Sequence, residues 1–241
     1  MLLFDPMYLA YVVPAFLLVL YAQYKVKSTY ARMSRVPVSS GVSGAEAAEH
    51  VLLSQGIPAD AGRGLWRTMP AGARAVTIGM ARGMLGDHYN PLNRSLALSP
   101  DVYSGRSLAA VAVAAHEAGH AVQHASGYKA LALRTGVANF AMAAGIAPYM
   151  FFLGLILHWG VLMNVAILLF GAYVVFALVT LPVEFNASRR AMAMLTQTGI
   201  VSAQEAPAAK SVLNAAALTY VAAAAMALLQ LLYFVMASRR D

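Results

Sequence analysis

Residues 137–157 read VANFAMAAGIAPYMFFLGLIL, a stretch of 21 residues without a charged side chain. As an α-helix it would be about 31 Å long, which matches the hydrocarbon thickness of a bilayer. Three more charge-free stretches long enough to cross a bilayer occupy residues 7–24, 161–183 and 215–237. The first is bounded by tyrosines and lacks the features of a cleaved leader, so we interpret it as an uncleaved anchor. We therefore expect a mainly α-helical membrane protein with four transmembrane helices.

The composition of the 241 residues agrees with this fold class. Hydrophobic residues make up 60% of the chain and charged residues 11%, whereas soluble domains have about 25% charged residues. These values exclude a wholly soluble globule and an intrinsically disordered chain. The chain has no cysteine, which excludes disulfides, thiolate metal sites and a cysteine nucleophile. The net charge of +7 comes from Lys and Arg beside the apolar spans, so we expect a topology signal and no nucleic-acid partner.

The longest polar stretch lies between the first and second spans and has the size of a small domain. The expected division is a transmembrane anchor at 1–24, a polar domain at 25–135, a transmembrane helical hairpin at 136–184, a cytoplasmic helical segment at 185–212 and a C-terminal transmembrane helix at 213–241. Residues 34–44, rich in Ser, Gly, Val and Pro, are interpreted as a linker.

Capping and turn signals predict the elements of the polar domain. The capping box Ser43-Gly-Ala-Glu46 predicts a helix that ends before Gly56. Short strands are expected at 75–80, 84–89 and 94–99, with a turn at 90–93 between the last two. A second helix is expected to begin after Ser104 or Ser107 and to end at Gly127. A second capping box at 202–205 predicts another helix, which continues into the fourth span.

Residues 116–120, on this second helix, read His-Glu-Ala-Gly-His. Imidazoles four residues apart lie on one helical face, close enough to bind one zinc ion at about 2.1 Å. Glu117 lies beside them, where a carboxylate can serve as general base to a water activated by the ion. The motif therefore predicts a catalytic site with one zinc ion per chain, His116 and His120 as ligands and Glu117 as the base. The alternative is an exposed polar helix face.

A catalytic zinc usually takes a third protein ligand. His124 is eight residues, about 12 Å of helical rise, from His116, which is too far for both to bind the ion that His120 binds. After Glu117 the next acidic residue is Glu184, at the end of the third span, where a carboxylate is costly unless it is paired, hydrated or bound to a cation. We expect Glu184 to be the third ligand, with Ser188 holding its second oxygen. The alternative is a helix-end carboxylate beside Arg189 and Arg190.

Several blocks of sequence together resemble the YugP-type family of bacterial membrane zinc metallopeptidases. They are residues 86–91 (GDHYNP), 96–103 (LALSPDVY), 113–124 (VAAHEAGHAVQH), 181–191 (LPVEFNASRRA) and 212–220 (VLNAAALTY). The resemblance implies a membrane-anchored neutral zinc peptidase with an HExxH motif and a small α+β, zincin-like (gluzincin-like) domain. It also implies His116, His120 and Glu184 as ligands. Asn90 and Asn186 stand where the family often has Asp, and neither is a proposed ligand or base.

A zinc peptidase needs a donor for the oxyanion that forms during hydrolysis. His88 is the first candidate, as an oxyanion or substrate contact, against the alternative of a structural hydrogen bond; Tyr89 and Tyr103 are further candidates. The alternating pattern of residues 94–99 is typical of a half-buried strand. This strand is interpreted either as an edge to which an extended substrate adds or as an ordinary interior strand.

The expected function is a membrane-anchored zinc metalloendopeptidase. Its partners are protein or peptide substrates, including membrane proteins, and the lipid bilayer; an oligomer or a membrane partner remains open. Of the 17 Lys and Arg residues, all but Arg239 and Arg240 lie inside if the N-terminus faces out, which predicts a multi-pass protein of the bacterial plasma membrane with a cytoplasmic active site. Two alternatives remain, an intramembrane-cleaving metalloprotease and a catalytically silent membrane scaffold that binds zinc.

Overall fold

The computed structural model describes residues 6–62, 75–81 and 86–239 and divides them into two units. Unit 1 comprises the described residues within 1–24, 129–183 and 218–241, and unit 2 comprises those within 25–128 and 184–217. Each unit has its own cluster of buried hydrophobic residues. Unit 2 is thus assembled from two segments of the chain that are more than 50 residues apart.

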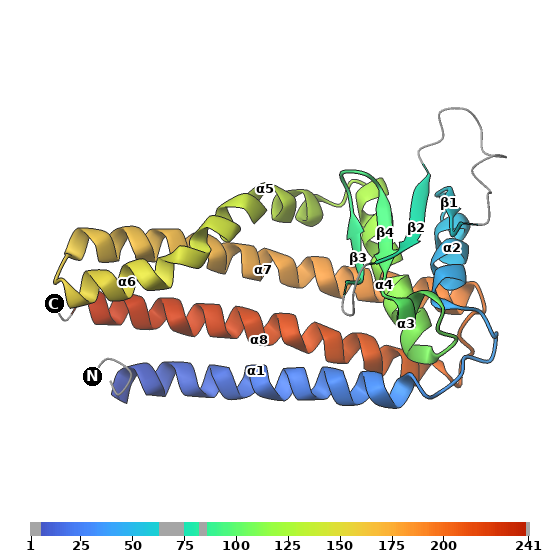
Figure 1. Cartoon of the computed structure of the whole chain (residues 1–241), viewed down its shortest axis with the longest axis horizontal. Coiled ribbons are helices and arrows are strands. Elements are labelled where there is room, and N and C mark those ends of the chain that lie inside the picture. Colours follow the sequence, from blue (N-terminus) through green and yellow to red (C-terminus); the bar gives the residue numbers. More distant parts are fainter. Residues whose placement is uncertain (1–5, 63–74, 82–85, 240–241) are drawn as a thin grey trace. The chain divides into compact units, whose positions relative to one another are not determined.

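Four helical segments within the described residues are long and apolar enough to cross a membrane. They are α1 (Pro6–Met33), the run of α5 (Lys129–Ala143), η3 (Ala144–Ile146) and α6 (Ala147–Ile156), then α7 (Gly160–Gln197) and α8 (Ala206–Ser238) (Figure 1). The four expected spans are confirmed as apolar helices of sufficient length. Each helical segment extends beyond the charge-free stretch that predicted it at one end or at both.

The second span is divided, whereas the sequence pattern predicts one continuous helix over 137–157. A 3₁₀ turn at Ala144–Ile146 separates α5 from α6, and Pro148 lies in the first turn of α6. Proline has no backbone N–H and its ring clashes with the carbonyl four residues earlier, here that of Ala144. The break therefore has a local cause that charge and hydropathy do not reveal.

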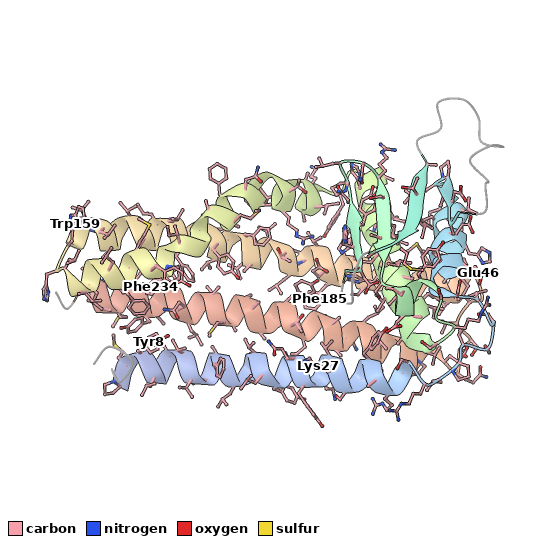
Figure 2. The ribbon with its side chains drawn as sticks, in the orientation of Figure 1. Tyr8, Lys27, Glu46, Trp159, Phe185 and Phe234 are labelled. Carbon is pink, nitrogen blue, oxygen red and sulfur yellow. The ribbon has the colours of Figure 1, made fainter. Side chains whose placement is uncertain are left out.

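Aromatic side chains form much of the buried core of unit 1. Phe151 of α6 stacks on Phe234 of α8 with ring centroids 4.1 Å apart. Tyr8, near the start of α1, meets Tyr233 edge to face at 4.9 Å (Figure 2 labels Tyr8 and Phe234). Such pairs contribute about 0.5–1.5 kcal/mol beyond the area that they bury. The helices of unit 1 are thus held together by specific ring contacts.

Unit 2 contains a small mixed sheet and the helices that pack with it. Besides parts of α1, α7 and α8, its elements are α2 (Gly44–Ser54), β1 (Ala59–Asp60), β2 (Val76–Met80), β3 (His88–Asn90), β4 (Ser95–Leu98), α3 (Pro100–Tyr103) and α4 (Leu108–Ala125). The strand order is β1-β2-β4-β3, with β3 antiparallel to β4 and the other pairs parallel. Strands β3 and β4 contact α4 (Figure 1). The expected strands are confirmed in kind, although Met84, where one was expected to begin, lies outside the described residues.

The position of β4 decides between the two interpretations of residues 94–99. β4 pairs with β2 on one side and with β3 on the other, so it is an interior strand. The interpretation as an edge strand is wrong. On this side of the sheet, the edge among the described strands belongs to β3, which has three residues. The alternating pattern reported one buried face, and such a face occurs on interior and edge strands alike.

The expected capping boxes are present, and one of them also holds the segment that we interpreted as a linker. Ser43 and Glu46 exchange hydrogen bonds at the start of α2. Ser202 and Glu205 do the same before α8. Glu205 also accepts hydrogen bonds from the N–H and hydroxyl of Ser39, both at 2.8 Å. Residues 34–44 are thus anchored to the fold and do not form a free linker.

Candidate metal centre

Helix α4 carries the motif at residues 116–120. Ser107 caps its first turn by accepting from the N–H of Ala110, and the chain leaves the helix through Gly127, whose φ of +62° suits glycine. His116 and His120 are each 8% exposed. Their ring centroids are 4.9 Å apart, as expected for side chains one helical turn apart. The helix therefore presents both imidazoles to the same buried place.

Glu184 of α7 meets the two imidazoles there. Its Oε2 lies 3.1 Å from Nε2 of His116 and 3.5 Å from Nε2 of His120, and the residue is 2% exposed. Figure 2 labels Phe185, the next residue along α7. Two ligand atoms on a tetrahedral zinc, each about 2.1 Å from the ion, lie about 3.4 Å apart. The spacing of these donors thus fits a zinc ion, and all three lie within 4.8 Å of one another.

The close approach of α4 and α7 depends on a glycine inside the motif. A Cβ atom built on Gly119 would lie 2.8 Å from the carbonyl oxygen of Ala187. That atom belongs to the backbone of α7, so it has little freedom to move away. The absence of a side chain at position 119 therefore lets Glu184 reach the imidazoles.

We expect Gly119→Ala to weaken zinc binding and to destabilise the protein by about 1–3 kcal/mol, because the added methyl pushes α4 away from α7. Zinc titration and thermal unfolding measure the two effects. Gly79→Ala is the matched control, since a Cβ atom there would meet nothing within 4 Å. Normal zinc affinity in Gly119→Ala would show that the two helices tolerate the extra volume.

The second ring nitrogen of each histidine has a side-chain partner. Nδ1 of His116 lies 3.1 Å from the hydroxyl of Ser188, and Nδ1 of His120 lies 3.0 Å from Oε1 of Gln123. Partners of this kind orient metal-binding imidazoles and keep Nε2 free for an ion. We expected the hydroxyl of Ser188 to hold the second oxygen of Glu184, and this expectation is wrong. Ser188 lies one turn after Glu184 on α7, and its hydroxyl contacts His116.

The electrostatics of the cluster favour a positive charge. Burial lowers the pKa of His120, but its hydrogen bond with Glu184 and the negative charges of Glu117 and Glu184 outweigh burial, so its pKa lies above the ordinary value of 6.5. A proton or a metal ion supplies the charge that these groups stabilise. Because zinc requires the neutral imidazole, the proton competes with it, and zinc binding weakens as the pH falls.

Glu117 projects toward the sheet, and its carboxylate is held by the edge strand. Its Oε2 accepts a hydrogen bond of 3.1 Å from the backbone N–H of Tyr89 in β3. The phenol of Tyr89 lies 2.8 Å from Nδ1 of His124 on α4. Burial raises the pKa of Tyr89, so the phenol keeps its proton at neutral pH and can donate it. His124 is thus a partner of Tyr89 and does not belong to the cluster around Glu184.

The structure does not bring His88 and Tyr103 into contact with this cluster. Nδ1 of His88 lies 2.6 Å from the carbonyl oxygen of Gly86, and its side chain is exposed. His88 pairs with Ala97, whereas its neighbour Tyr89 pairs with the buried Leu96, so the two side chains lie on opposite faces of the sheet. The hydroxyl of Tyr103 donates to the carbonyl oxygen of Ala61. Among the three candidates for an oxyanion donor, Tyr89 is the one connected to Glu117.

Sequence reasoning missed the side chains that support His120. They are Gln123, Asn186 and Arg190, which form a chain of hydrogen bonds. Two spacings point to such a group. Gln123 follows His120 by three residues on one helical face, and Arg190 follows Asn186 by four. Only contact between α4 and α7 shows that these two pairs meet.

Comparisons with known proteins agree with this site. A family model described as "Putative neutral zinc metallopeptidase" matches residues 8–61 and 62–239. The chain is 44% identical over 219 residues to the "Putative membrane protease YugP" of Bacillus subtilis (strain 168), covering 90% of this chain and 89% of the relative. No solved structure matches the chain. The chain belongs to this family of neutral zinc metallopeptidases.

Proposed function

We propose that the protein is a zinc metalloendopeptidase of the bacterial plasma membrane that hydrolyses peptide bonds at the cytoplasmic face. The observation that carries the proposal is the convergence of His116, His120 and Glu184 next to a carboxylate, Glu117, that is not one of the three donors. A purely structural zinc site has no use for such a neighbouring carboxylate. Family membership supports the same assignment.

In this proposal His116 and His120 would hold the ion through Nε2, and Glu184 would hold it through a carboxylate oxygen. When bound, zinc supplies Lewis acidity that polarises the scissile carbonyl and makes a water molecule more acidic. Glu117 takes the proton of that water on its carboxylate and later delivers it to the leaving amine. The N–H of Tyr89 holds Oε2 of Glu117, which restricts the orientation of the base while the other oxygen accepts the proton.

We expect the purified protein to contain about one zinc per chain and to cleave an unfolded substrate such as casein. A chelator should abolish cleavage because it removes the zinc, and added zinc should restore cleavage because the three donors bind it again. Zinc content by atomic emission and fragment analysis on gels measure both. A zinc-loaded protein that leaves casein intact, and cleaves no membrane substrate either, would favour the catalytically silent scaffold.

The cytoplasmic location is proposed from the distribution of positive charge. Lys25, Lys27, Arg32 and Arg35 follow the first span, and an N-terminus facing out leaves only Arg239 and Arg240 outside. Unit 2, which contains the three donors, then lies inside. The proposed substrates are cytoplasmic segments of membrane proteins or peptides that reach this face.

Single cysteines in this cysteine-free chain test the location without background. Leu92, in the turn between β3 and β4, is 91% exposed, and a Cβ atom at Gly160, the first residue of α7, would meet nothing within 4 Å. We expect Leu92→Cys to resist a membrane-impermeant thiol reagent in intact cells and Gly160→Cys to react with it. After the cells are opened, both should react. Labelling of Leu92→Cys in intact cells would place the metal centre outside.

A further inference from the structure

The two imidazoles of the metal centre are supported by different kinds of hydrogen-bond partner. His116 faces the hydroxyl of Ser188, which can donate or accept and so accommodates a proton on either nitrogen of that ring. His120 faces Oε1 of Gln123, which can only accept. Gln123 is 0% exposed, so no solvent competes for this contact. The support of His120 is therefore directional.

The orientation of the Gln123 amide is set further along the chain of hydrogen bonds. Nε of Arg190 donates to Oδ1 of Asn186 over 2.9 Å, and Nε2 of Gln123 donates to the same oxygen over 3.0 Å. A guanidinium has no acceptor, so Asn186 must present its oxygen to Arg190. Gln123 must then present its NH₂ group to Asn186, which leaves its oxygen for His120. Arg190 itself lies over the ring of Tyr128, with 6.0 Å between guanidinium carbon and ring centroid.

The direction of these hydrogen bonds also determines the state of Nε2 of His120, the nitrogen proposed to bind the metal. Because Oε1 of Gln123 accepts, Nδ1 of His120 must carry a hydrogen, and in the neutral ring Nε2 then has a free lone pair. That nitrogen is the one that faces Glu184. If His120 took the other tautomer, two acceptors would face each other in a buried site, at the cost of a hydrogen bond.

We propose that Arg190 and Asn186 are positioning residues that act through Gln123 to hold His120 in the tautomer that binds the metal. The inference rests on the proposed zinc site and extends it to three residues that are not among its three donors. Loss of such outer partners typically weakens metal binding 10- to 100-fold.

The test compares Asn186→Leu with Asn186→Asp. Leucine removes the acceptor at almost constant size, whereas the aspartate carboxylate still accepts from both Arg190 and Gln123. We expect zinc dissociation constants, measured by competition with a chromophoric chelator, to rise 10- to 100-fold for Asn186→Leu and to stay near wild type for Asn186→Asp. Visible spectra of the Co²⁺-loaded proteins report whether the ligand geometry changes with affinity.

Arg190→Met and Arg189→Met form a matched pair on α7. Arg190 belongs to the chain of hydrogen bonds and Arg189 is its exposed neighbour, so only the first is expected to weaken zinc binding. This pair decides the matter if Asn186→Leu fails to fold. Equal zinc affinities of Asn186→Leu and Asn186→Asp, or of Arg190→Met and Arg189→Met, would overturn the role proposed for this chain of hydrogen bonds. Failure of the wild type to bind zinc would instead overturn the proposed function.

Discussion

Glu117→Gln is expected to lower peptidase activity by about 10²- to 10⁴-fold, the range that general acid–base catalysis contributes. Zinc content should remain normal, because Glu117 is not among the three converging donors. The fold should also persist, since the amide oxygen of glutamine can still accept from the N–H of Tyr89, as Oε2 of Glu117 does. The substitution thus removes the basicity of the side chain and keeps its contact with β3.

The measurement is the initial rate of casein cleavage by zinc-loaded proteins, with metal content determined on the same samples. Glu205→Gln is the control, because this carboxylate accepts hydrogen bonds from Ser39 and from the N–H of Ser202 before α8, in another part of unit 2. We expect the Glu117→Gln variant to bind substrates and to cleave them only slowly, so the membrane proteins that co-purify with it should identify natural substrates. Near-normal cleavage by Glu117→Gln would remove Glu117 as the general base.

Glu184→Ala is expected to lose most of the bound zinc, with affinity lowered more than the 10- to 100-fold typical of outer partners. Two imidazoles alone leave a catalytic zinc without its third protein ligand. In Glu184→Ala, peptidase activity should fall together with zinc content. In Glu117→Gln, activity should fall while zinc content stays normal.

A zinc titration by equilibrium dialysis measures this loss, and circular dichroism checks that the helices remain. His124→Ala is the matched control on α4, since His124 contacts the phenol of Tyr89 and not Glu184. Full zinc retention by Glu184→Ala would contradict the assignment of Glu184 as the third ligand. Loss of zinc from His124→Ala would show that the helical rise argument against it is wrong.

The fold was predictable where the signal is local. The length and absence of charge of a span are written in consecutive residues, as are the capping boxes at Ser43 and Ser202 and the helix start at Ser107. The division of the second span was equally local, since Pro148 is visible in the sequence; hydropathy simply takes no account of a missing N–H.

Strand pairing was not predictable from the same patterns. The alternation in residues 94–99 indicates a strand with one buried face, yet it says nothing about how many neighbours the strand has. β4 is interior because β2, more than ten residues away, runs parallel to it. Parallel pairing joins segments that are separated in the chain, so no short window of sequence contains the information.

The sequence by itself determined which side chains could form the centre: His116, Glu117 and His120 through helical spacing, and Glu184 through the cost of a carboxylate at the end of an apolar span. The tertiary structure decided how each one is held. Ser188 contacts His116 and not Glu184, and Tyr89, not His88, is connected to Glu117. A chain of hydrogen bonds that begins at Arg190 ends at His120. The contacts of Tyr89 with Glu117 and of Ser188 with His116 join residues that are 28 and 72 positions apart in the chain. The directions of their hydrogen bonds exist only once α4, α7 and β3 are packed together.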